Sequence, residues 1–370
     1  MGLLKFFRID LLITLAAVAV AWAYGGARAA SVTAILIVVE IVFSFDNAAV
    51  NAKYLAKLNA FWQRMFLTVG VLIAVFGMRL VFPFVVVCFS GGISPAEAVR
   101  LAMAQGDPAQ PGTYGYVLNQ AHPAIAAFGG VFLLMLFLDF LFDTERDQWW
   151  LSWVERPLAR AGHLDSLSVL CAVAALLLTA QLLATADIAR TVLTSGIFGL
   201  ATYVAVSGVS TVMEDREAKK AELLDPVEQP SRAALGLAGR AAFSLFIFLE
   251  VLDASFSFDG VIGAFAITPD PLIIALGLGV GALYVRSMTV YLVRRGTLAE
   301  YRFLEHGAHW AIGALAVMLL ITIRWHVPDI AIGLVGIMFI ALSFAWSVRA
   351  NRIDAADSDS LDERARVESS

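Results

Sequence analysis

A short acidic motif occurs twice in this chain, both times inside a stretch apolar enough to cross a membrane. The first copy runs Glu40-Ile-Val-Phe-Ser-Phe-Asp46-Asn47, and the second runs Asp253-Ala-Ser-Phe-Ser-Phe-Asp259-Gly260. The acid, the Ser-Phe pair and the second Asp fall at the same offsets in both copies. A carboxylate at the centre of a bilayer costs about 2.5 to 3.5 kcal/mol on insertion scales. Four carboxylates in matching places therefore indicate a functional site, and a cation is the expected ligand.

The composition predicts an all-α polytopic membrane protein. Sixty per cent of the 370 residues are hydrophobic and 15% are charged, and the mean hydropathy is +0.79, an excess that a soluble core of this size does not need. Runs of about 20 apolar residues can cross a hydrocarbon core of about 30 Å as helices. We predict ten spans, at 9–25, 31–52, 65–87, 124–142, 166–184, 190–212, 236–262, 270–292, 306–324 and 328–347.

The lysine and arginine distribution orients these spans, because cytoplasmic loops are enriched in both residues. Alternate loops carry clusters of them, whereas the other loops hold only Arg28, Arg100, Arg190 and Arg324. Both termini are therefore predicted to be cytoplasmic, with the chain in a bacterial inner (plasma) membrane and an irregular external loop at 88–123. Alternatively, Lys5, Arg8 and the apolar run after them form a signal peptide that is cleaved near Arg28.

The chain divides into two like units. Arg79 and Arg286 each lie in the span after an acidic motif, and a glycine-containing span follows in each half. Because the charge assignment gives the units opposite orientations, we expect an inverted-topology repeat with a site near the midplane. The expected domains are an N-terminal helix at 1–30, a first repeat at 31–165, two connecting helices and a charged cytoplasmic linker at 166–235, a second repeat with the final helix at 236–347, and a disordered tail at 348–370.

The spacing within each motif predicts broken helices. On a straight helix at about 100° per residue, Glu40, Ser44 and Asn47 share one face while Asp46 points away from it. We expect local unwinding around 45–47 and 258–260, which brings the acids and freed carbonyl oxygens together. Carboxylate, amide and carbonyl oxygens suit Mn²⁺, Mg²⁺ or Ca²⁺ better than Cu⁺ or Zn²⁺.

Two roles for the acids remain open. They either pair with Arg79 and Arg286 as structural ion pairs, or they hold a cation or protons that neutralise the excess of acids over arginines. The two arginines are candidates for structural pairing or for gating. The auxiliary candidates are Ser44, Ser257, Glu250, Arg79, Arg286 and Asp139. His306 and His309, next to Glu305, have a spacing that can hold a metal, but at a span entrance we expect them to be solvated.

The motifs resemble those of the TerC integral membrane family, which is named for tellurium resistance and is placed in the lysine-exporter superfamily. The resemblance rests on the Glu-x5-Asp-Asn and Asp-x5-Asp motifs and on the arginine-bearing span after each, and it covers residues 30–325. The string from Leu249 to Phe265 is closer to an uncharacterised branch of that superfamily. At Gly260 the chain departs from the family, which commonly has Ser followed by Ile-Pro.

The resemblance implies metal-ion homeostasis, notably Mn²⁺ efflux, or tellurite resistance. Carried over by motif, it implies that the metal ligands are Glu40, Asp46, Asn47, Asp253 and Asp259. We expect a secondary transporter and not an enzyme, with no tightly bound cofactor. Since no P-loop is apparent, ionic gradients rather than ATP are expected to drive transport. The bilayer and a divalent metal ion are the expected partners, with no nucleic acid. The alternatives are a non-transporting subunit of a membrane metal or tellurite stress complex and a membrane-embedded hydrolase with paired aspartates.

Overall fold

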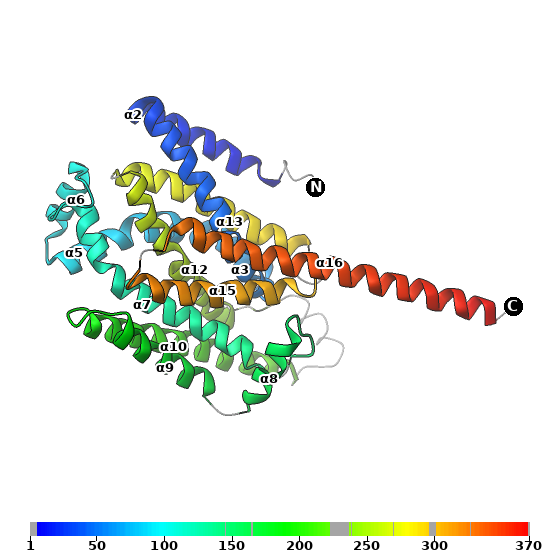
Figure 1. The fold of residues 1–370 in the computed structure, drawn as a ribbon. Helices are drawn as coiled ribbons and strands as arrows, with labels where there is room; N and C mark the ends of the chain where they lie inside the picture. The colour runs from blue at the N-terminus through cyan, green and yellow to red at the C-terminus, as the bar shows by residue number, and fades with distance from the viewer. Residues whose placement is uncertain are drawn as a thin grey trace.

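The computed structural model describes residues 6–144, 146–163, 166–222, 237, 239–268, 270–295, 301–325 and 327–368, and within these ranges it contains helices and no strands (Figure 1). The helices are α2 (Arg8–Phe43), α3 (Phe45–Leu55), α4 (Ala60–Leu72), the π-helix η1 (Ile73–Val81), α5 (Phe82–Gly91), α6 (Pro95–Ala104), α7 (Tyr114–Leu141), α8 (Ser152–Ala161), α9 (Leu167–Leu182), α10 (Ala189–Glu222), α12 (Gly239–Ile267), α13 (Pro271–Arg295), α15 (Leu304–Thr322) and α16 (Asp329–Glu368).

Seven helical segments of the described chain are long and apolar enough to cross a membrane, as expected of a multi-pass membrane protein. They lie in α2, in the continuous run Ala60–Cys88, and in α7, α10, α13, α15 and α16. The predicted span at 9–25 lies within α2, and the one at 31–52 covers the end of α2 and most of α3. The backbone of α2 leaves the helical region at Gly25 and Gly26, with φ 67° at Gly26. The predicted spans at 166–184 and 236–262 correspond to α9 and α12, which are outside the seven. Ten spans therefore stay a prediction.

The bundle is built around α7. This helix is apolar around its whole circumference, which is typical of a helix with neighbours on all sides, and it packs against α10 and α15. The C-terminal part of α2 crosses α13, and α3 lies against both α13 and α15. The N-terminus, α8 and the end of α16 lie at one end of the bundle, and α6 lies at the opposite end (Figure 1).

Two segments differ from the irregular structure that was predicted for them. The segment 88–123 contains α6, which begins at a strong start signal: the Ser94 side chain accepts a hydrogen bond from the Glu97 backbone N–H, and Pro95 occupies the first turn. The segment 348–370 is helical as far as Glu368, because α16 continues beyond the bundle (Figure 1). Extending an existing helix is far easier than starting one, and the tail contains four Ala and four Arg, both good helix formers.

The helix interruption that was predicted at the acidic motifs occurs in the first copy alone. Ser44, with φ −99° and ψ 17°, separates α2 from α3. The bonds from Ser44 N to Glu40 O at 3.0 Å and from Ala48 N to Ser44 O at 3.2 Å span this point, so the chain bends without unwinding. By contrast, α12 runs unbroken through 258–260, and the unwinding predicted there is wrong. Gly260 instead provides space, since a Cβ atom there would lie 3.3 Å from Glu40 Oε2.

Candidate functional site

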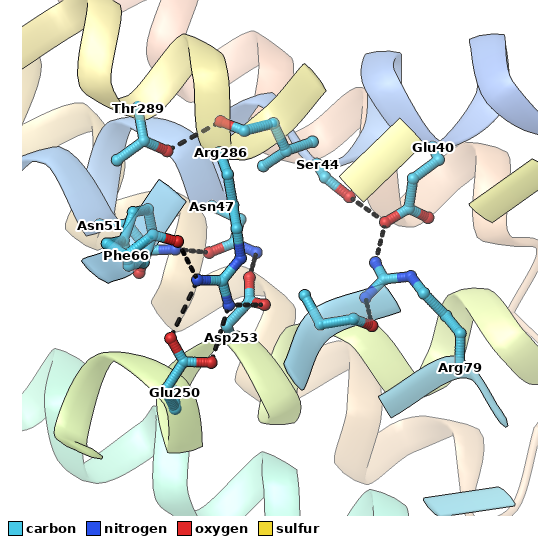
Figure 2. Close-up of polar contacts among 12 residues, drawn as sticks. Glu40, Ser44, Asn47, Asn51, Phe66, Arg79, Glu250, Asp253, Arg286 and Thr289 are labelled. Atoms are coloured by element: carbon cyan, nitrogen blue, oxygen red, sulfur yellow. Dashed lines mark hydrogen bonds and ion pairs between the residues drawn. The ribbon is translucent and has the colours of Figure 1, made fainter. Parts of the chain in front are cut away.

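The arginine of the second repeat lies at the centre of a buried charge cluster. Arg286 on α13 is 1% exposed and forms two parallel bonds with Glu250, each of 2.9 Å, while its Nη2 also donates to Asp253 Oδ2 at 2.8 Å (Figure 2). Its Nη1 donates to the Phe66 carbonyl at 3.3 Å, and the guanidinium lies over the Phe66 ring. The planar fork of arginine matches this paired arrangement of acceptors, which a lysine cannot satisfy.

A chain of amides from α3 extends this cluster. Asn47 Nδ2 donates to Asp253 Oδ1 at 2.9 Å, and Asn51 Nδ2 donates to Asn47 Oδ1 at 2.8 Å (Figure 2). Asn51 is fully buried, and its Oδ1 has no hydrogen-bond partner within the described part of the chain. A buried amide oxygen without a donor is uncommon and is an open position for a water or a cation. Asn51 was missed in the sequence, although it lies one turn after Asn47 on the same helix face.

The first repeat forms a smaller cluster. Glu40 at the end of α2 pairs with Nη2 of Arg79, and Ser44 Oγ donates to Glu40 Oε1 at 3.2 Å (Figure 2). Arg79 Nη1 also donates to the Ala74 carbonyl at 3.0 Å. Arg79 lies in η1, and π-helical turns are frequent at functional sites. The Nε atoms of Arg79 and Arg286 are both buried without an acceptor among the described residues.

The two motifs approach each other reciprocally. Asn47, the last residue of the first copy, bonds Asp253, the first residue of the second copy. Gly260, the last residue of the second copy, faces Glu40, the first residue of the first. Residues more than 200 positions apart thus contribute to adjoining charge clusters.

Close helix contacts at glycines position both clusters. A Cβ at Gly281 of α13 would lie 2.4 Å from Glu40 Cβ, and one at Gly70 of α4 would lie 2.3 Å from Arg286 Nη1 and 2.6 Å from Glu250 Oε1. These separations are too short for any side chain, so glycine is required where the carboxylates and the guanidinium pass their neighbours.

We expect Gly70→Ala to lower the free energy of unfolding by about 2 to 3 kcal/mol, because the new methyl group must displace the buried Arg286–Glu250 pair. Gly77→Ala in η1 is the matched control, since its nearest neighbour would be the Ile73 side chain at 3.6 Å. SDS titration of the purified protein in mixed micelles measures both variants. Equal stability of the two would show that the Gly70 contact does not constrain the pair.

The other predicted site residues either lie away from these two charge clusters or have side chains that the structure does not describe. The side chains of Asp46, Ser257 and Asp259 lie outside the described part of the structure. Asp139 accepts a hydrogen bond from Tyr203 Oη at 2.7 Å and lines a separate cavity of about 400 Å³ between α7, α9 and α10. The side chains that the structure describes contain no group of three or more His, Cys, Asp or Glu residues placed to hold a metal. The predicted ligand set as a whole stays a prediction.

The prediction that His306 and His309 are solvated is wrong. Both are buried. His306 Nδ1 donates to Glu155 of α8 at 3.1 Å. His309 stacks on the Phe140 ring at 3.9 Å and donates from Nδ1 to the Glu305 carbonyl at 2.8 Å. These partners lie on α7, on α8 and in the first turn of α15. Tertiary packing, rather than the position of the histidines at the entrance of a span, therefore determines their burial.

One comparison with known proteins gives a match. The profile of a family described as "Protein of unknown function (DUF475)" matches residues 45–354. The matched range contains Asp46, both buried arginines and the whole second motif, and it begins just after Glu40. No curated protein and no solved structure matches the chain significantly.

Proposed function

The chain belongs to the DUF475 family of proteins of unknown function, and from its buried charges we propose that it is a secondary transporter that exports a divalent cation. The observation that carries the proposal is the reciprocal contact of the two motifs, Asn47 with Asp253 and Gly260 with Glu40. Buried ion pairs of this kind contribute little net stability, because desolvation offsets their attraction. Ionisable groups at such positions in membrane helices typically mark ion pathways.

The reciprocal contact supports an inverted-topology repeat. In each half, an acid from the motif pairs with the arginine of the following segment, Glu40 with Arg79 and Asp253 with Arg286. In each half, the last motif residue meets the first acid of the other half. Two units related in this way place one site at their interface, as in many transporters. The same reasoning supports the ten-span arrangement.

We propose that the arginines act as tethered substitutes for the transported ion. Glu40 pairs with Arg79, and Glu250 and Asp253 share Arg286, so each of these carboxylates has a guanidinium partner. A cation that enters competes with the arginines for the same oxygens, and the open Asn51 Oδ1 offers a further hard ligand. The net charge of the site is therefore nearly the same whether the arginines or the cation hold these oxygens. This similarity lowers the free-energy cost of reorienting the site across the membrane without its ion.

Mn²⁺ is the substrate that the resemblance to the TerC family favours. The all-oxygen ligand set of carboxylates and amides agrees with Mn²⁺, Mg²⁺ or Ca²⁺ and disfavours thiophilic ions. For the location, we propose the bacterial inner membrane with both termini in the cytoplasm. The common position of the N-terminus and the end of α16, opposite α6, supports this arrangement (Figure 1).

Ion flux from the purified protein in liposomes tests the proposal. We expect Mn²⁺ uptake that is at least about tenfold above empty liposomes and that Asp46→Asn and Asp259→Asn each abolish, because each loses a charged oxygen ligand. Glu97→Gln, which neutralises a carboxylate in the exposed pair with Arg100, should transport normally. A protein that binds Mn²⁺ but gives no flux would instead indicate a non-transporting subunit of a membrane complex.

A further inference from the structure

The short helix α8 is fixed to the bundle by one buried carboxylate. Glu155 is 0% exposed and accepts hydrogen bonds from Trp310 Nε1 at 2.9 Å, the Trp150 backbone N–H at 3.0 Å and His306 Nδ1 at 3.1 Å. Burial raises the pKa of Glu155, but the hydrogen bonds from His306, Trp310 and Trp150 outweigh it, so the pKa lies below its usual value. The carboxylate therefore stays charged at neutral pH and holds α8 in one orientation.

This orientation turns an aromatic and basic face away from the bundle. Arg156 lies three residues after Trp153, and Arg160 lies four residues after Arg156. This spacing places the three side chains on one side of the helix. All three are exposed, Trp153 at 79%. A tryptophan beside arginines on the outer face of a short amphipathic helix is typical of a helix that lies in the membrane–water interface.

A cavity opens on the same side of α8. Its volume is about 320 Å³, and it is lined by Thr144, Trp149, Arg156, Ala159, Arg160 and His163. Two guanidinium groups, an imidazole and a hydroxyl group thus converge on one space, and none of the described residues that line it is acidic. Pairs of arginines bind phosphate through paired, charge-assisted hydrogen bonds. The volume is at the small end of the range for ligand sites, which suits a headgroup but not a whole lipid.

We propose that this cavity binds the phosphate of an anionic phospholipid headgroup, with the acyl chains alongside the exposed Trp153. A lipid is favoured over a soluble phosphate because the arginines share their helix face with the large, exposed apolar side chain of Trp153. Among the neighbouring acids that the structure describes, Glu155 points into the bundle, and Asp143 and Asp147 are absent from the cavity wall. The inference is independent of the transported ion.

Native mass spectrometry of the full-length protein in detergent tests the site. After incubation with phosphatidylglycerol or phosphatidylcholine, the protein should retain phosphatidylglycerol with about 30-fold higher affinity, the fold-change that corresponds to about 1 kcal/mol for each of the two arginines near the headgroup. The double variant Arg156→Gln/Arg160→Gln should lose this preference. Arg64→Gln/Arg349→Gln, which removes two exposed arginines elsewhere, is the matched control and should keep it.

Three results would overturn the proposal. The first is equal retention of both lipids by the wild-type protein, and the second is an unchanged preference in the Arg156/Arg160 variant. The third is displacement of bound phosphatidylglycerol by millimolar inorganic phosphate alone, which would show a site for a soluble anion. Because Arg156 and Arg160 are exposed, their replacement should leave the thermal unfolding midpoint unchanged, so a loss of lipid reports on the site and not on folding.

Discussion

Replacing Arg286 with methionine is expected to lower the free energy of unfolding by about 3 to 5 kcal/mol, as for other buried ion pairs that lose one partner. The reason is that Glu250 and Asp253 lose their common counter-ion while both remain buried. SDS titration of the purified protein measures the change. Arg286→Lys should recover only part of the free energy of unfolding that Arg286→Met loses, because one ammonium group cannot reproduce the paired bonds to Glu250.

The matched control for Arg286→Met removes the charges on both sides. In the triple variant with Glu250→Gln and Asp253→Asn, the described Arg286 cluster contains no unpaired charge, and most of the lost stability should return. Arg64→Met, which removes an exposed arginine, should have no measurable effect. Wild-type stability in Arg286→Met alone would show that the two acids are neutral in the membrane and do not need the guanidinium.

Helical periodicity and hydropathy predict the class of the protein well, because both depend on local sequence. The apolar runs predict the membrane helices, and the spacing of Glu40 and Ser44 correctly predicts that their side chains meet on one face. The duplicated motif also identifies both buried arginines, because an arginine inside an apolar span requires a buried acidic partner. The structural alternative, in which acids and arginines pair, describes Glu40, Asp253 and their partners in this structure.

The contacts between distant segments could not be predicted in this way. Glu250 has no acidic counterpart in the first repeat, so symmetry assigned it only an auxiliary role, yet it makes the paired bonds to Arg286. The partner of Asp253 in the other repeat is Asn47, which periodicity alone cannot place opposite it. Local unwinding was expected around 258–260, whereas α12 is continuous there, and the small size of Gly260 accommodates Glu40 from another helix.

The asymmetry between the two clusters has a mechanistic consequence. Arg286 is held by two carboxylates, but Arg79 is held by Glu40 and by the Ala74 carbonyl of its own π-helical turn. Among the side chains that the structure describes, withdrawal of Arg79 from its acid therefore breaks fewer charged bonds than withdrawal of Arg286. We expect an entering cation to displace Arg79 first, and Glu40 to be the first carboxylate that it binds.

If Glu40 and Asp253 bind one ion, the loss of either should already remove most of the affinity. We expect Glu40→Gln and Asp253→Asn each to weaken Mn²⁺ binding about 100-fold, since direct ligands should match or exceed the 10- to 100-fold effect of outer-shell partners. The double variant should add little, because residues that share a ligand are strongly non-additive. Asp253→Asn should still fold, since Arg286 retains Glu250.

Isothermal titration of Mn²⁺ into each purified variant measures the affinity and the number of sites, and Glu97→Gln on α6 serves as a control for the loss of an exposed carboxylate. Ligands of separate sites more than about 7 to 10 Å apart act independently. Two separate sites would therefore appear as half the wild-type stoichiometry in each single variant and as complete loss in the double variant. That result would exclude a shared site between the repeats and would assign the contact of Asn47 with Asp253 to packing, while metal binding itself would stand.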